Sequence, residues 1–447
     1  MIENRLSIFN KIYNISKVSQ DKFTLWMNHL LVVYAFLIPI NNKAKTSVFF
    51  CILLLFLYRR NFIYYLKIAF KNYLLKYFLL LYLSFVVGML YTSDLESGFS
   101  FMDKAKLLLY PLIFLSFLDE RFSFRILNAF IFGVLLSEIV SYLIHFQMIP
   151  PELFIGEYKI YKSILEDPSP FFTHGIHNMF LCIVITILIY RILVKDIKNY
   201  KFKILSLIFI TTAFLNISLI GGRVGYVVLF CLIFFLIFLI YKKEILKGIF
   251  ILLSIFFIMF TYLYNFSDQF DKRIEDGKND LEKIITEKNY NSSIGLRIIT
   301  GYYVLEIIKD NFLIGVGTGD VMQEVNELAN QKHSYIKLIS HPHNLYLEIL
   351  AQLGIIGFSM MLLMFYKILC YEAEDRKRSD IVKIITVAFL IYVLTASFWS
   401  HLATFVTLIS AMICVQKFDV HVKEIDKESI LKYILVIIIF LIIGITK

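Results

Sequence analysis

The 447-residue chain has few cysteines and few charged residues, and both scarcities narrow the class of protein. The five cysteines lie in or beside apolar runs and form no Cys-x-x-Cys pair, so neither a disulfide framework nor a thiolate metal site is predicted. Charged residues make up 18% and hydrophobic residues 59%, a composition typical of a polytopic membrane protein. The chain also lacks a Walker loop, a dinucleotide fingerprint and a Gly-x-Ser-x-Gly nucleophile motif.

Long apolar runs are abundant, and none alternates apolar and polar residues as a membrane β-strand would. We therefore predict an all-α, polytopic transmembrane bundle of about twelve spans, among them 105–118 and 401–416, with a possible thirteenth at 431–446. About nine spans lie in residues 1–265, a large loop containing helices covers 266–343, and the remaining spans lie in 344–447.

The basic residues orient this bundle. With the N-terminus inside, the predicted cytoplasmic segments hold 28 Lys and Arg, whereas the short outer connections hold 7. Cytoplasmic loops of membrane proteins carry the excess of such residues, so the large loop is predicted to lie outside. The net charge of +10 thus reflects topology, and no nucleic-acid partner is predicted.

The two outer segments differ in character. In 266–343 the run from Ile294 to Ile314 is amphipathic and predicts a helix lying on the bundle, after which the glycines of 315–319 turn the chain. The outer loop from Pro150 to Thr173 contains four prolines and is predicted to be ordered by turns rather than helical.

The most informative motif is Ser340-His341-Pro342-His343-Asn344, which precedes an apolar helix containing Gly354 and Gly357. Asn344 can cap that helix, and the positive helix end favours anions while lowering the proton affinity of a nearby imidazole. The glycine pair predicts a groove that another helix can approach closely. A plain packing role for His343 and these glycines is the alternative interpretation.

Basic and imidazole groups are predicted on the same face. Arg223 lies among glycines between two apolar runs, where a guanidinium must meet an anion or face the protein interior, or else snorkel to the surface. Arg297, Lys104, Lys106 and His174 share that face by topology; for the lysines an ordinary interfacial role is the alternative, and for His174 and His177 a core role. A metal site of His341, His343 and Glu348 is conceivable, but paired carboxylates for Mg²⁺ are lacking, and we predict no metal or cofactor.

These motifs resemble the O-antigen ligase family. His343-Asn344 with Gly354 and Gly357 match its His-[Asn/Ser/Gln]-x9-Gly-x-x-Gly signature, and Arg223 matches its arginine near the outer end of a middle span. Arg297 and the run 312–317 resemble its Arg and Pro-Leu-x-Gly-x-Gly stretch, with Phe312 in place of proline. The resemblance covers roughly 200–370; a membrane-spanning 431–446 would depart from the family's twelve spans with both ends cytoplasmic.

The resemblance implies a glycosyltransferase of the bacterial inner membrane whose active site faces the periplasm. The donor would be a glycan on undecaprenyl diphosphate and the acceptor the lipid A-core, within surrounding membrane lipid. His343 would be the general base. Arg223 and Arg297 would hold the diphosphate, with Lys104, Lys106, His341, Asn344 and His174 as further substrate-binding residues.

Two other functions stay open at this point. A polymerase of the same superfamily would use the same donor and join repeat units on the lipid carrier. A flippase or other transporter of lipid-linked glycans would be expected to carry polar residues deep in several spans and internal symmetry, and we identify neither in the sequence.

Overall fold

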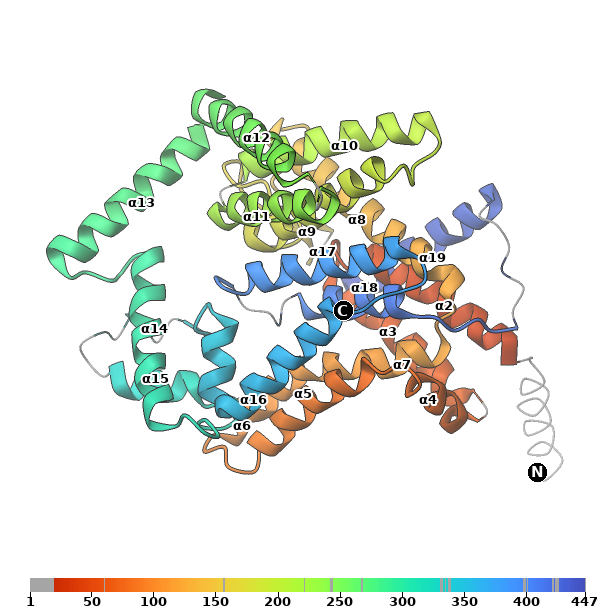
Figure 1. Cartoon of the computed structure of the whole chain (residues 1–447), viewed down its shortest axis with the longest axis horizontal. Coiled ribbons are helices and arrows are strands. Elements are labelled where there is room, and N and C mark those ends of the chain that lie inside the picture. Colours follow the sequence, from red (N-terminus) through yellow and green to blue (C-terminus); the bar gives the residue numbers. More distant parts are fainter. Residues whose placement is uncertain are drawn as a thin grey trace.

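The computed structural model describes residues 20–446, apart from 60, 156, 221, 242–243, 267, 330–332, 334, 337–338, 397–398, 400, 420–421 and 423–425. Figure 1 shows a helical bundle with α13, α14 and α15 gathered at one end of the long axis and α2 and α4 toward the other. The N-terminal half contains α2 (Gln20–Leu37), α3 (Asn42–Tyr58), α4 (Phe62–Ala69), α5 (Leu75–Gly88), α6 (Leu95–Ala105), α7 (Tyr110–Phe117), α8 (Ser123–His145), α9 (His174–Leu193) and α10 (Tyr200–Leu219).

Nine further helices follow in the described part of the chain: α11 (Arg223–Ile240), α12 (Ile245–Phe266), α13 (Asp268–Glu287), α14 (Ser293–Asp310), α15 (Val321–Ala329), α16 (Leu345–Leu369), α17 (Arg376–Tyr392), α18 (Leu402–Ile413) and α19 (Lys427–Thr446). Two short 3-10 helices, η1 (Lys106–Leu109) and η2 (Glu120–Phe122), precede α7 and α8. The all-helical prediction is confirmed except for a small antiparallel hairpin of β1 (Glu152–Ile155) and β2 (Tyr158–Lys162). This hairpin lies in the loop from Pro150 to Thr173, which we predicted to be ordered by turns rather than helical.

Five helices in the described residues are long and apolar enough to cross a membrane, at 120–145, 174–193, 200–219, 345–369 and 428–445. Two of the predicted spans form helices shorter than a full span. The run 105–118 divides into η1 and the eight-residue α7, and the run 401–416 forms α18 of twelve residues. At 1.5 Å per residue, neither helix crosses the roughly 30 Å hydrocarbon layer alone.

These two half-length helices occupy the centre of the bundle. Every residue of α18 is buried, and the helix packs against α7, α8 and α17. Because other helices and not lipid surround α18, a length of half a membrane costs no exposed backbone groups. The predicted total of about twelve spans remains a prediction.

The segment 293–336 has a small apolar core of its own. It is built by Ile299, Val304, Ile307 and Ile308 of α14, Val321 and Val325 of α15, and Ala351 of α16. The predicted amphipathic helix after Ile294 is thus confirmed as α14, which packs against the first turns of α16. This contact brings α14 beside the histidine motif.

The last helix, α19, packs lengthwise on the bundle. Its Tyr433 hydroxyl lies 2.5 Å from His29 Nδ1 of α2, and Gly444 near its other end lies against Ala44 of α3. Hence α19 runs parallel to α2 and antiparallel to α3. A helix of this length and direction agrees with the predicted thirteenth span, and its C-terminal end lies on the side of residues 43–45, which we predicted to be outside.

Candidate functional site

The histidine motif forms a fixed turn at the start of α16. The Asn344 side chain accepts a hydrogen bond from the Leu347 N–H at 3.1 Å, which confirms the predicted helix cap. His343 has a φ of 57°, a left-handed conformation that is unfavourable for a residue with a side chain. Its N–H donates to His341 Nδ1 at 3.2 Å, and the centroids of the two imidazole rings lie 4.2 Å apart. The turn therefore holds both imidazoles in contact.

Both imidazoles are held in the neutral form. Burial, followed by the neighbouring His341 and Arg297, lowers the pKa of His343 to about 4. Burial also lowers the pKa of His341, with Lys104 and Arg297 contributing in the same direction. Neutral imidazole is the form that accepts a proton, and the lowered pKa keeps His343 in this form at neutral pH.

The motif opens into a cavity of about 890 Å³ at the meeting point of six chain segments. Four other predicted site residues lie in its wall with His343: His341, Arg297, Lys104 and His174. The remaining lining residues are Thr173, Gly175, Ile176, Gly222, Val224, Ser293, Ile294, Tyr392, Thr395, Ala396 and Trp399. Residues distant in the sequence are thus gathered at one site, and its volume is within the range of small-molecule sites.

Arg297 lies one helical turn after the start of α14. Its Nη1 donates to the Ser293 carbonyl and the Ser293 hydroxyl, both at 3.0 Å, and these bonds hold the guanidinium at the cavity wall. A guanidinium in this position can bind a phosphate with two parallel hydrogen bonds.

The two lysines that we predicted to bind substrate have different positions. Lys104, in α6, lines the cavity with an exposed side chain. Lys106 forms an ion pair with Asp103 and is not one of the lining residues, so the structure does not bring it to this cavity. Asn344 likewise serves as the cap of α16 and not as a lining residue.

Arg223 is the first residue of α11, and its neighbours Gly222 and Val224 line the cavity. The side chain of Arg223 lies outside the described part of the structure. The flanking glycines have a local reason: a Cβ on Gly222 would lie 2.7 Å from Asn178 Nδ2, and one on Gly225 would lie 2.8 Å from it. Small residues therefore allow α9 and α11 to meet beside the cavity.

The glycines of α16 have a partner that we did not predict. Gly354 has a φ of 59° and a ψ of −166° and breaks the helix, and a Cβ there would lie 2.3 Å from the carbonyl group of Leu313. The predicted close approach exists, but it is made by the loop that follows α14 and not by another helix. Gly357, one turn on, leaves room for the Leu353 side chain, because a Cβ at position 357 would lie 2.2 Å from the Leu353 Cβ.

That loop is joined to the broken helix by main-chain hydrogen bonds. The Val316 and Gly317 N–H groups donate to the Ala351 and Gln352 carbonyls at 2.9 and 3.0 Å, and the Ile355 N–H donates to the Phe312 carbonyl at 2.8 Å. The break in α16 frees these backbone groups, and the loop satisfies them. The two sequence motifs, 312–317 and 354–357, are therefore two sides of one joint.

Asp320 extends this joint to α6. Its carboxylate accepts hydrogen bonds from the Ser93 N–H at 2.6 Å, the Thr92 hydroxyl at 2.5 Å and the Asp94 N–H at 3.2 Å. Asp94 then caps α6 by accepting from the Glu96 and Ser97 N–H groups. Because α6 carries Lys104, the carboxylate of Asp320 positions this lysine relative to the histidine motif.

Polar groups also continue into the bundle behind the cavity. His177, one turn after His174, bonds Ser137 at 3.2 Å and Asn216 at 3.0 Å, and Asn216 donates to Ser141 at 2.9 Å. Glu138 of α8 is buried nearby, one residue from Ser137. These polar residues lie within about two turns of the end of α8, the start of α9 and the end of α10.

Residues 204–362 match the family model described as O-antigen ligase. The match runs from α10 into α16 and includes Arg223, Arg297 and the histidine motif. This match supports the predicted resemblance to the O-antigen ligase family over that region. A Haemophilus influenzae protein described as uncharacterized is 28% identical over 230 residues, which are 48% of this chain and 57% of that protein.

Proposed function

We propose that the chain is an inverting, metal-independent glycosyltransferase that moves a glycan from an isoprenyl diphosphate, undecaprenyl diphosphate in bacteria, to the lipid A-core. The observation that carries this proposal is the cavity itself, where a neutral His343 lies with Arg297 and Lys104. A base beside cations suits a reaction in which a hydroxyl loses a proton while a diphosphate gains charge.

The proposed reaction forms one bond and breaks one. The acceptor hydroxyl oxygen attacks the anomeric carbon of the donor, and the bond from that carbon to the diphosphate oxygen breaks with its electron pair. His343 takes the hydroxyl proton, while Arg297, Arg223 and Lys104 stabilise the departing isoprenyl diphosphate. Attack opposite the leaving group inverts the anomeric centre.

The site would face the periplasm in this proposal. The cavity is lined by the ends of helices that the Lys and Arg distribution predicts to be outside, and 266–343 forms much of its neighbourhood. The inner membrane of a bacterium is the location that such a donor requires.

A polymerase that joins repeat units on the carrier is the second candidate, since it needs the same donor site and the family match is equally compatible with it. A null mutant distinguishes the two. Loss of a ligase leaves long polymer on the carrier, whereas loss of a polymerase leaves single repeats attached to the core. The buried polar network also keeps transport testable: glycan transfer between lipids by purified protein without any gradient would exclude transport as its sole activity.

The base assignment is tested by His343→Ala, with His145→Gln as the matched control because His145 ends α8 and does not line the cavity. We expect the His343 variant to lose polymer attachment on a lipopolysaccharide gel and the control to retain it. Normal attachment by well-expressed His343→Ala protein would refute the assignment.

A further inference from the structure

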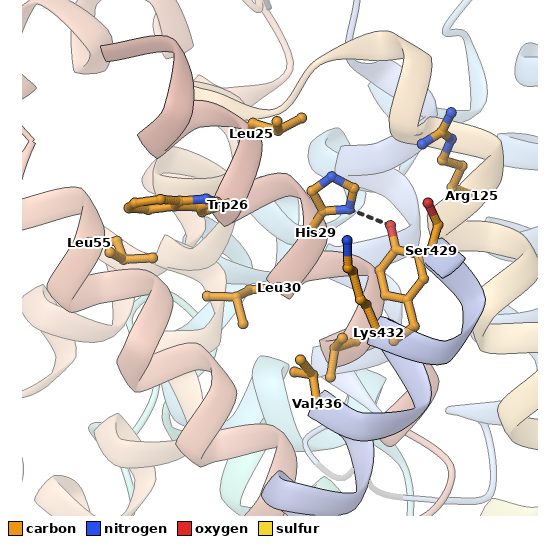
Figure 2. Close-up of a pocket in the computed structure, with 11 residues that line it drawn as sticks. Leu25, Trp26, His29, Leu30, Leu55, Arg125, Ser429, Lys432 and Val436 are labelled. Atoms are coloured by element: carbon orange, nitrogen blue, oxygen red, sulfur yellow. Dashed lines mark hydrogen bonds between the residues drawn. The ribbon is translucent and has the colours of Figure 1, made fainter. Parts of the chain in front are cut away.

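Another pocket, of about 500 Å³, lies between α2, α3 and α19 (Figure 2). It shares no lining residue with the histidine cavity and is formed by other helices. Two of its lining residues, Arg125 and Ser429, lie near the starts of α8 and α19, on the side that the basic residues predict to be cytoplasmic. The proposed glycosyl transfer makes no use of it.

One end of this pocket is polar and holds two cations, with the carboxylates of Glu428 and Asp426 near Lys432. Arg125 near the start of α8, together with Ser429 and Lys432 in the first two turns of α19, lines this end. The Tyr433 hydroxyl lies 2.5 Å from His29 Nδ1, and Arg125 lines the same end of the pocket (Figure 2). Lys432 has an ion pair at 2.6 Å with Glu428, and both side chains are largely exposed.

The other end is apolar and faces the membrane. Leu30, Val33, Leu55 and Val436 line it, and Val436 lies two turns, or roughly 10 Å, below Ser429 along α19. Only 11% of the apolar window of α19 is buried, so lipid must cover most of this helix and reach the pocket mouth. Trp26 also lines the pocket, and 45% of its surface is exposed, as is common for tryptophan at a membrane surface.

We propose that this pocket binds an anionic glycerophospholipid, with its phosphate at Arg125 and Lys432 and its upper acyl chains along the apolar end. Arg125 lies in the wall at this end, and a guanidinium can donate two parallel hydrogen bonds to a phosphate. Lys432 is attached to a flexible stem and can turn from the exposed Glu428 carboxylate to a phosphate. The cytoplasmic leaflet supplies anionic lipids of this kind. A bound lipid would join α19 to α2 and α8.

Trp26 provides a direct measurement of this lipid. The chain has two tryptophans, so Trp399→Phe leaves Trp26 as the one tryptophan. We would reconstitute this full-length variant into phosphatidylcholine vesicles containing 10% phosphatidylglycerol. In one preparation the phosphatidylglycerol carries brominated acyl chains and in the other the phosphatidylcholine does, at equal bromine content. We expect brominated phosphatidylglycerol to quench Trp26 more strongly, with a binding preference of about fivefold for each contributing cation.

The controls separate the pocket from general charge attraction. Lys432→Gln should weaken the preference about fivefold, and because its side chain is exposed the variant should fold; adding Arg125→Gln should abolish the preference. Lys71→Gln, at an exposed position just after α4, should leave the preference unchanged. Equal quenching by the two lipids, or full preference in the double variant, would overturn the proposal. Displacement of phosphatidylglycerol by inorganic phosphate would also overturn the proposal, because it would indicate a simple anion site. So would its displacement by undecaprenyl phosphate at a lower fraction than that of phosphatidylglycerol.

Discussion

The pH dependence of transfer tests the electrostatics of the site most directly. The pKa of His343 is about 4 because the ring is buried and lies near His341 and Arg297. At pH 5.5 such a group is roughly 97% neutral, whereas an imidazole with the ordinary pKa of 6.5 would be only about 9% neutral. We therefore expect kcat/KM, which reports the free enzyme, to stay nearly constant between pH 7.5 and 5.5, where an unperturbed base would give about a tenfold fall.

Removing the charge of Arg297 should shift this behaviour in a known direction. Arg297 lowers the pKa of His343, so Arg297→Gln should move the acid limb of kcat/KM to higher pH, while Arg297→Lys retains the charge and should not. In the donor complex, the diphosphate charge should raise the same pKa, so kcat should fall at a higher pH than kcat/KM.

The assay is the initial rate of glycan transfer from a purified lipid-linked donor to acceptor in detergent, measured from pH 5 to 8. The residual activity of His343→Gln provides the control, because any limb that it retains belongs to other groups such as the donor phosphates. A tenfold fall in wild-type kcat/KM centred near pH 6.5, absent from His343→Gln, would contradict our account of the site.

Three further predictions concern how the site is built. Lys104→Gln should weaken donor binding about tenfold and Lys106→Gln should not, as measured by KM, because Lys106 pairs with Asp103 outside the cavity. Gly354→Ala should destabilise the protein by more than about 1 kcal/mol, whereas Gly301→Ala, whose Cβ meets only Leu347 Cδ1 at 3.9 Å, should be tolerated; thermal unfolding in detergent distinguishes them. Asp320→Asn should lower the thermal unfolding midpoint and raise KM for the donor. The reason is that hydrogen bonds to a charged carboxylate, such as those of Asp320, contribute about 1.5–3 kcal/mol each. An unchanged unfolding midpoint would show that the carboxylate does not hold α6.

Features that depend on a few neighbouring residues were predictable from the sequence. The cap at Asn344, the helix after Ile294 and the turn at Gly315–Gly319 follow from local side-chain chemistry, backbone preference and apolar spacing. The grouping of His343, Arg297 and Lys104 followed from topology, since helix ends on one face of a membrane bundle are close together.

Features that depend on distant partners were not predictable in the same way. A glycine pair indicates close approach, yet nothing in 354–357 says that the partner is a loop forty residues earlier. The length of an apolar run likewise does not reveal whether lipid or protein surrounds it, so α7 and α18 were predicted as spans. Asp320 was overlooked for two reasons. An acid after a glycine turn has no distinctive pattern, and the partners of its carboxylate lie more than 220 residues away in the sequence.

These distant contacts explain how an apolar bundle can hold a polar site in a fixed geometry. The break at Gly354 exposes backbone groups of α16, and the loop 312–317 satisfies them. The same loop continues to Asp320, which binds the turn before α6, and α6 carries Lys104. Hydrogen bonds shielded from water are stronger than those at a surface, so each step of this connection restricts movement of the next. The lysine and the histidine therefore lie in one cavity because a single loop binds the helices that carry them, and the family's glycine motifs are where that loop attaches.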